Sequence, residues 1–337
     1  MKTEIKNIKV AAISTTVQNK IRKAKDLFKK SKDKNKFKAS AETLGVEQSY
    51  FTEDKITTVD LCYASSLEVM KKLKWNKNDV QILVFVTQTP DYLMPSCSNI
   101  LQKKLKLNNR CVCYDINLGC SGYVYGLWNI CSVMEHNSNL KKGILAVGDT
   151  MSKTILKNDE INKLLFGDSG SATAIQKMQN QSINFILGSD GKGSDKLMIK
   201  QSGFRGKKGK PYFFMDGIEV FYFAILNVPN LIRRLLIFSK KKMKNIKYYI
   251  FHQANKFMID KISENLKIEK EKMLYSIREF GNTSSASIPT TICANYKKFK
   301  SKKNDNQAIL SGFGAGYSYA AAHLDLSKTK IFKINKI

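Results

Sequence analysis

The sequence predicts an α/β fold, in which short apolar strands alternate with amphipathic helices. Residues 81–87 and 247–251 are short, almost uniformly apolar runs, which are typical of central strands covered on both faces. Each half of the chain shows strand, helix and glycine-rich turn in the same order. That order indicates an internal duplication, with halves at 1–177 and 178–337, and layers of helices packed on sheets.

In the first half, residues 5–16 are expected to form the first strand. The Lys-rich segment 18–45 is expected to be helical or loosely ordered, with its charges on a solvated face. Apolar residues then recur every three or four positions and predict a helix over 57–73, with Thr58 as its N-cap. Further along we expect a loop over 88–96, a helix over 97–105, a strand over 143–148, a loop over 165–171 and a strand over 172–176.

In the second half, a Gly-, Ser- and Lys-rich connection is expected over 188–210, before a helix that begins near Met215. A helix is predicted over 256–266, after the sequence His252-Gln-Ala-Asn255. The segment 273–280 leads to Gly281-Asn-Thr-Ser-Ser-Ala-Ser287, and the turn Ser311-Gly-Phe-Gly-Ala-Gly-Tyr317 joins the last two strands.

The bulk composition is that of a folded protein without a membrane span. Of 337 residues 43% are hydrophobic, and no run reaches the ~20 apolar residues that a span needs. The longest candidate, Phe221–Ile232, is interrupted by polar residues and a proline. Without an apolar leader at the N-terminus, we expect a cytoplasmic protein. The seven cysteines have no metal-like spacing and are expected to be reduced thiols, with no metal or cofactor.

The net charge of +29 indicates an acidic partner or a nucleic acid. The lysines are spread over the whole chain, and the aromatic residues do not interleave with them as they do on base-stacking surfaces. We therefore expect no nucleic acid among the partners.

A cysteine marks the junction of a strand and a helix. The residues from Cys111 alternate like a strand, Gly119 breaks the pattern, and helical spacing begins at Tyr123. Cys120 should therefore lie in the first turn of a buried helix, where the helix dipole and free backbone N–H groups lower the pKa of a thiol. We predict that Cys120 is a nucleophile; the alternative is a small buried apolar residue.

Two other loops offer side chains of catalytic type, namely His252 and Asn282, and both follow short strands or begin helices. The ordered motifs Cys120-Ser-Gly, His252-Gln-Ala-Asn, Gly281-Asn-Thr and Gly312-Phe-Gly-Ala-Gly resemble the β-ketoacyl-acyl carrier protein synthase III family of the thiolase superfamily. Further matching motifs are Thr89-Pro-Asp-Tyr, Leu165-Phe-Gly-Asp-Ser-Gly and Met215-Asp-Gly-Ile-Glu-Val-Phe.

The resemblance implies a thiolase-like five-layer α-β-α-β-α fold built from two pseudo-repeated halves, and a homodimer. It implies that Cys120 takes up an acyl group and that His252 and Asn282 support decarboxylation of a malonyl thioester. The backbone N–H groups of Cys120 and Ala315 would form the oxyanion hole. Met94 would reach across the dimer into the partner's acyl pocket; the alternative for Met94 is an ordinary interface or core residue.

The implied partners are acyl carrier protein, acyl-CoA or acyl-ACP as primer, and malonyl-ACP. The chain lacks the N-terminal tryptophan that often stacks on the adenine of coenzyme A, so the carrier of the primer stays open. Because acyl carrier protein is acidic, candidate docking charges are Lys256, Arg233, Arg234 and the run Lys240–Lys244, unless these are only solvated helix surface.

Asp168, His136 and His323 are expected to be structural. Two other functions stay open at this stage. The first is a Cys-dependent acyltransferase that passes the acyl group to an alcohol or amine without decarboxylation. The second is a non-catalytic basic binding protein.

Overall fold

Two long antiparallel strands hold the two halves of the molecule together. The computed structural model describes residues 1–206, 209–300 and 305–337. β1 (Lys2–Val17) pairs with β7 (Ser169–Ser189) along most of its length, and both belong to one ten-stranded sheet. The strand predicted over 172–176 is therefore only the first part of β7, whose later part pairs with a strand of the second half. The predicted boundary at 177/178 lies inside β7, and this division stays a prediction.

The strand order repeats in the two halves. In the first half, β4 lies between parallel β5 and β6, and β6 is antiparallel to β7. In the second half, β10 is parallel to β11, which is antiparallel to β12, and Tyr249 forms a parallel bridge with Met273 on the other side. This repeat supports an internal duplication. The strands are β4 (Ile82–Val86), β5 (Val112–Ile116), β6 (Lys142–Asp149), β10 (Tyr248–Phe251), β11 (Gln307–Gly314) and β12 (Ser318–Asp325).

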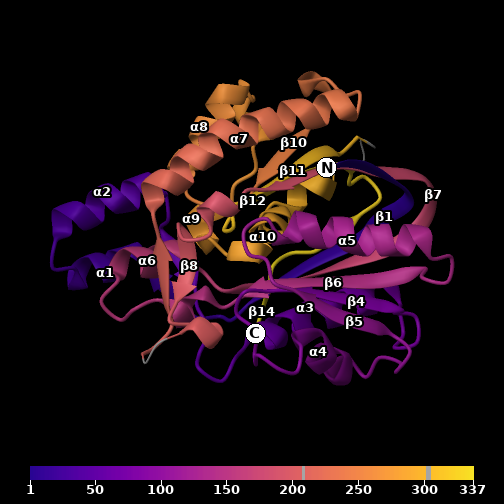
Figure 1. The fold of residues 1–337 in the computed structure, drawn as a ribbon, viewed down its shortest axis with the longest axis horizontal. Coiled ribbons are helices and arrows are strands. Elements are labelled where there is room, and N and C mark those ends of the chain that lie inside the picture. The colour runs from indigo at the N-terminus through magenta and orange to yellow at the C-terminus, as the bar shows by residue number, and fades with distance from the viewer. Residues whose placement is uncertain (207–208, 301–304) are drawn as a thin grey trace.

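Helices cover both faces of each half of the sheet, which makes five layers (Figure 1). The outer helices pack on the strands of their own half, and two helices fill the middle layer between the halves. The predicted five-layer thiolase-like architecture is therefore confirmed. The outer helices are α3 (Thr58–Leu73) and α4 (Cys97–Leu105) on one side and α7 (Gly217–Phe238) and α8 (Lys256–Leu266) on the other; the middle ones are α5 (Gly122–His136) and α10 (Ser287–Ala294).

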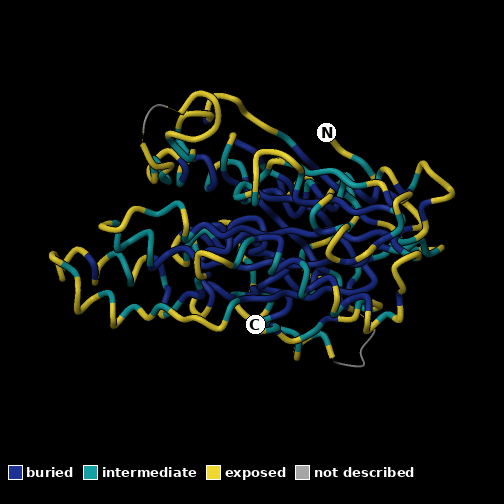
Figure 2. The backbone as a smooth tube through the Cα atoms, turned by 90° about the horizontal axis from the view of Figure 1, so that it is seen from below, coloured by how far each residue is buried: buried dark blue, intermediate teal, exposed yellow. Residues whose placement is uncertain are grey.

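The apolar runs of β4 and β10 are buried because each strand feeds two cores. Val84 and Ile250 face the middle layer, and their neighbours Phe85 and Phe251 face the outer helices. Successive side chains of a strand point to opposite faces, so a strand with helices on both sides needs apolar residues throughout. In Figure 2 the buried backbone accordingly runs through the middle of the molecule.

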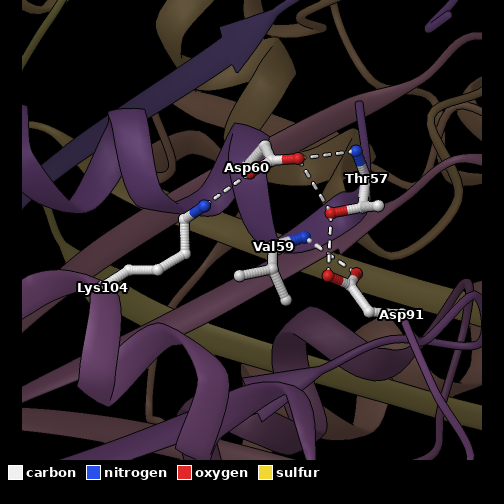
Figure 3. A network of polar contacts seen from close by, with 5 residues as sticks. All are labelled: Thr57, Val59, Asp60, Asp91 and Lys104. Carbon is white, nitrogen blue, oxygen red and sulfur yellow. Dashed lines mark hydrogen bonds and ion pairs between the residues drawn. The ribbon is translucent and has the colours of Figure 1, made fainter. Parts of the chain in front are cut away.

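Helix α3 begins at a capping box that also anchors a neighbouring loop (Figure 3). Its N-cap is Thr57 rather than the predicted Thr58, because the Thr57 N–H donates to Asp60 Oδ2 at 3.0 Å. The Thr57 hydroxyl donates to Asp91 Oδ2 at 2.8 Å, and Lys104 of α4 pairs with Asp60 at 2.8 Å. Asp91 thus fixes the 88–96 loop to the start of α3, and Lys104 joins α4 to the same turn.

Smaller elements complete the described fold. The Lys-rich segment forms two helices, α1 and α2, and the predicted 188–210 connection contains a strand that pairs with another just before α7. These elements are β2 (Ile21–Lys23), α1 (Ala24–Lys30), α2 (Lys34–Leu44), β3 (Gln48–Tyr50), α6 (Glu160–Leu165), β8 (Leu197–Lys200), β9 (Tyr212–Met215), α9 (Ile277–Phe280), β13 (Lys330–Ile331) and β14 (Asn335–Lys336).

Helix α7 continues through Pro229, one of the residues that interrupt its apolar run. Within the described ranges it is the one helix long and apolar enough to cross a membrane, and half of its most apolar window is buried in the fold. Core helices of soluble proteins have the same length and composition, so this is weak support for a span.

Candidate active site

Cys120 lies in the turn between β5 and α5. Helix α5 begins at Gly122 with Ser121 before it, so Cys120 lies in the predicted strand-to-helix turn, two residues before the first helical residue. The Ser121 hydroxyl is 2.6 Å from the Ser318 hydroxyl, which ties this turn of the first half to β12 of the second.

The strand β11 passes directly beside the sulfur. A Cβ added to Gly314 would lie 2.5 Å from Cβ and 2.7 Å from Sγ of Cys120, and one on Gly312 would lie 2.7 Å from the Cys120 carbonyl oxygen. Real Cβ atoms do not approach other atoms this closely. The glycines of the Gly312-Phe-Gly motif therefore let the two halves meet at Cys120.

The predicted lowering of the thiol pKa is wrong for the free protein. Burial, with a smaller contribution from the nearby Asp149 carboxylate, raises the pKa of Cys120 to about 12. The backbone N–H groups of Ala315 and Cys120 both lower the pKa, but by less than burial raises it. The thiol is thus protonated at neutral pH, because it is largely shielded from water and faces a negative charge.

The same two N–H groups form a pair of donors beside the sulfur. The Cys120 N–H belongs to the turn before α5, and the Ala315 N–H belongs to the turn that joins β11 to β12. Both lower the pKa of the Cys120 thiol. The second turn is held by the Tyr317 N–H, which donates to the Asp190 carbonyl at 2.6 Å, and by Ser318 Oγ, which donates to the Ala315 carbonyl at 2.8 Å. The donors predicted for an oxyanion hole are therefore fixed before any substrate arrives.

His252 follows β10 and is held by three contacts. Its backbone N–H donates to the Ser311 carbonyl at 2.8 Å, and Nδ1 lies 2.7 Å from the Ser287 hydroxyl. The ring stands perpendicular to Phe313 with 5.7 Å between ring centres. Burial lowers the pKa of His252 to about 3, and the backbone of Ser284 offsets only part of this. The imidazole is therefore neutral at physiological pH.

The backbone two residues further along the chain orients the Asn282 side chain. Its Oδ1 accepts from the Ser284 N–H at 2.9 Å, which leaves the Nδ2 group as the donating end of the amide. The preceding Gly281 has φ of 66°, and a Cβ there would lie 2.5 Å from the Leu165 carbonyl oxygen. A side chain at 281 would be strained and would clash, so the glycine of the Gly-Asn-Thr motif places the amide.

Cys120, His252 and Asn282 line one cavity of about 90 Å³. The structure thus brings together the three residues that the sequence singled out. Ala315 lines the same cavity, and the rest of its wall is mainly apolar, which suits an acyl chain. The apolar lining is Met151, Leu165, Phe166, Leu197, Phe213, Met215, Val220, Met258 and Phe313.

Sequence reasoning missed the buried carboxylate that joins the loops around the cavity. Asp149 accepts from the Gln88 N–H at 2.8 Å and from the Ser285 N–H at 3.1 Å, besides three hydroxyl groups. Gln88 lines the cavity, and Ser285 follows the residue that holds Asn282. The one sequence signal was a charged residue directly after an apolar strand.

The other predicted residues lie outside the cavity. Asp168 is buried and accepts from the N–H groups of Thr52 and Ser152, as expected of a structural residue. His136 is on the surface next to the Ser132 carbonyl, and His323 contacts Gln307. In the part of the chain that the structure describes, no cluster of His, Cys, Asp or Glu could hold a metal ion.

The surface residues predicted to meet partners are distributed over the molecule. Met94 is 86% exposed and lies outside this chain's own cavity. Arg233 donates to Asn265, and Lys256 pairs with Asp260. Arg233 lies thirteen residues, or about 20 Å of helix, beyond Val220 of the cavity wall.

Two family models and several known proteins match this chain. Residues 114–191 match the family model for 3-oxoacyl-[acyl-carrier-protein] synthase III, and residues 238–326 match the model for its C-terminal part. A Campylobacter jejuni protein, provisionally named 3-oxoacyl-[acyl-carrier-protein] synthase 3, is 33% identical over 96% of both chains. The β-ketoacyl-[acyl-carrier-protein] synthase III of Clostridium tetani is 33% identical over 82% of this chain and 86% of its own.

The crystal structure of a 3-oxoacyl-(acyl-carrier protein) synthase from Burkholderia xenovorans covers 100% of this chain and 99% of its own, with a TM-score of 0.94 and 32% identity. Fold and cavity together define an acyl-transferring condensing enzyme of the thiolase fold. The chain belongs to the 3-oxoacyl-[acyl-carrier-protein] synthase III family, and the resemblance noted in the sequence is confirmed.

Proposed function

We propose that this enzyme condenses an acyl group held on Cys120 with malonyl-ACP, and so forms β-ketoacyl-ACP for fatty-acid or specialised lipid synthesis. The observation that carries the proposal is the shared cavity of Cys120, His252 and Asn282, with two backbone N–H groups beside the sulfur. The named relatives support the substrate class.

In the first half-reaction, Cys120 Sγ attacks the carbonyl carbon of an acyl thioester. The Sγ–C bond forms, the C–S bond of the substrate breaks, and the thiol proton ends on the departing sulfur. The N–H groups of Cys120 and Ala315 stabilise the oxyanion, and one such donor is typically worth about 3 kcal/mol. Because the thiol is protonated at rest, its proton must move to the departing sulfur as the Sγ–C bond forms.

In the second half-reaction, the malonyl group loses CO2 and its electron pair forms an enolate. Nδ2 of Asn282 and one ring nitrogen of neutral His252 donate hydrogen bonds to the enolate oxygen. The carbanion then attacks the acyl carbon, the bond to Sγ breaks, and the Cys120 thiolate takes up a proton from water. A histidine that stays neutral at pH 7 suits this donor role, because its proton remains on the ring.

The test separates the two half-reactions. The protein is incubated with acyl-CoA, acyl-ACP and malonyl-ACP, and the adduct, the CO2 and the product are measured by mass spectrometry. We expect an acyl adduct that is lost in Cys120→Ala, and variants His252→Ala and Asn282→Ala that acylate but condense poorly. An adduct without CO2 release would overturn the proposal and favour transfer to an alcohol or amine. Equal loss of both half-reactions in the two variants would contradict their assigned roles.

We also propose a homodimer in which Met94 completes the partner's acyl pocket. Strand β5 lies at the edge of the sheet, and Tyr92, Leu93 and Met94 are 64%, 79% and 86% exposed on a loop whose base is anchored by Asp91. An exposed apolar loop beside a sheet edge fits a contact between copies. Sedimentation equilibrium gives the mass of the assembly, and a monomer with full activity would refute the dimer.

The proposed location is the cytoplasm. All seven cysteines are free thiols, although Cys111 and Cys113 have sulfur atoms only 3.9 Å apart. Unpaired thiols at this distance suit a reducing compartment. Fractionation of cells with an antibody against the native protein tests the location, and recovery in a membrane fraction would contradict it.

A further inference from the structure

The helix pair α1–α2 carries a large excess of positive charge. Between residues 23 and 38 stand eight lysines and two aspartates, an excess of six positive charges. All eight lysine side chains are exposed, and none forms an ion pair among the described residues. The lysines are Lys23, Lys25, Lys29, Lys30, Lys32, Lys34, Lys36 and Lys38.

The helix pair projects from one end of the molecule, beyond α6 (Figure 1). No residue of α1 is buried. α2 is attached by Phe37 and Leu44, which share an apolar cluster with Leu165 and Phe166 of the cavity wall. The charged pair is therefore tied to the cavity by direct packing.

A groove lies between the helix pair and the first residue of α8. Its volume is about 550 Å³, and Lys25, Lys38, Lys256 and Arg278 contribute cations to its lining, with Glu42 and Glu47 as acids. Lys256 stands directly after Asn255, which lines the cavity. Gly45, at the end of α2, is so close to Lys256 that an added Cβ would lie 2.4 Å from the lysine Cβ.

We propose that α1–α2 is the docking surface for the acidic carrier protein that delivers the thioester substrates. The inference rests on the proposed function, because it supplies the partner of the same cavity. Unpaired cations attract an acidic partner over a Debye length of about 8 Å at physiological salt and steer its approach. A partner held there lies next to elements that pack on the cavity wall, whereas Arg233 and Arg234 lie in the last turns of α7 and Lys240–Lys244 follow its C-terminal end.

The experiment compares two matched sets of four lysines. The first variant carries Lys29→Gln, Lys30→Gln, Lys32→Gln and Lys36→Gln, and the control carries Lys240→Gln, Lys241→Gln, Lys242→Gln and Lys244→Gln. Each is assayed for condensation with malonyl-ACP and with malonyl-pantetheine, which lacks the carrier protein. Circular dichroism melting checks that both variants fold.

We expect the first variant to raise the KM for malonyl-ACP about tenfold at low salt, with unchanged kcat and unchanged kinetics on malonyl-pantetheine. Rim charges act mainly on association, so the salt dependence of kcat/KM should also become shallower. The control should stay within twofold of the native enzyme on both substrates.

Three results would overturn the docking proposal. They are an unchanged KM for malonyl-ACP, an equal effect of the control set, or an equal loss on malonyl-pantetheine. If the first variant instead loses only affinity for a mixed-sequence DNA duplex, the surface serves nucleic acid. If the native enzyme releases no CO2 from either substrate, the proposed function is contradicted, but the docking proposal is not. In that case fluorescence anisotropy with labelled carrier protein measures the binding affinity of the native protein and the first variant, and so decides the docking.

Discussion

The close approach of β11 to Cys120 makes Gly314→Ala a sharp test of how the nucleophile is placed. The new methyl group would lie 2.5 Å from Cβ and 2.7 Å from Sγ of Cys120, where ordinary contact begins at 3.4 Å. The backbone of Gly314 is not in the left-handed region, so alanine adds no backbone strain there. The sulfur or β11 must therefore move by close to 1 Å.

The expected magnitude follows from that displacement. Extra volume in a well-packed core costs about 1–3 kcal/mol of folding stability. A reacting atom misplaced by about 1 Å loses about 10²-fold in rate. We expect Gly314→Ala to fold with slightly lower stability and to acylate about 100-fold more slowly, measured by intact mass spectrometry after mixing with acyl-CoA or acyl-ACP.

The matched control is Gly191→Ala, because an added Cβ there meets no atom within 4 Å. It should acylate at the native rate and melt at the native temperature. If Gly314→Ala folds and acylates as fast as Gly191→Ala, then the packing of β11 against the sulfur does not position the nucleophile, and the reasoning is refuted.

Three further outcomes follow from the buried polar groups. Asp149→Ala leaves the backbone N–H groups of Gln88 and Ser285 without their acceptor. Each unsatisfied group costs about 1–3 kcal/mol, so the free energy of unfolding from urea titration should fall by about 2–6 kcal/mol. Asp149→Asn should lose less, and an Asp149→Ala variant as stable as the native protein would contradict this bridging role. The folded-state pKa of His252 is about 3, below the ordinary 6.5, so the unfolded chain binds a proton that the folded one excludes. Stability should therefore fall by about 1.4 kcal/mol per pH unit below pH 6.5, and His252→Gln should flatten that slope in acid denaturation. The raised pKa of Cys120 predicts that its alkylation by iodoacetamide keeps accelerating between pH 6 and 10, whereas a plateau near pH 8 would show an activated thiolate.

Much of the local structure could be predicted because periodicity and glycine placement act over a few residues. The bounds of α4 and α8 agree with the predicted 97–105 and 256–266. The sequence motifs also singled out Cys120, His252 and Asn282, which line one cavity. The apolar runs of β4 and β10 indicated strands covered on both faces. These features depend on near neighbours in the chain, which a sequence displays directly.

What only the tertiary structure decided depends on groups far apart in the chain. The pKa of Cys120 is raised by burial and by Asp149, which together outweigh the backbone N–H groups beside the sulfur. The partners of Asp149 come from residues 87–89 and 285, and the second donor beside the sulfur comes from Ala315. The length of β7 depended on pairing with strands of both halves. Desolvation and through-space charge depend on distance in the folded molecule, so no local pattern could reveal them.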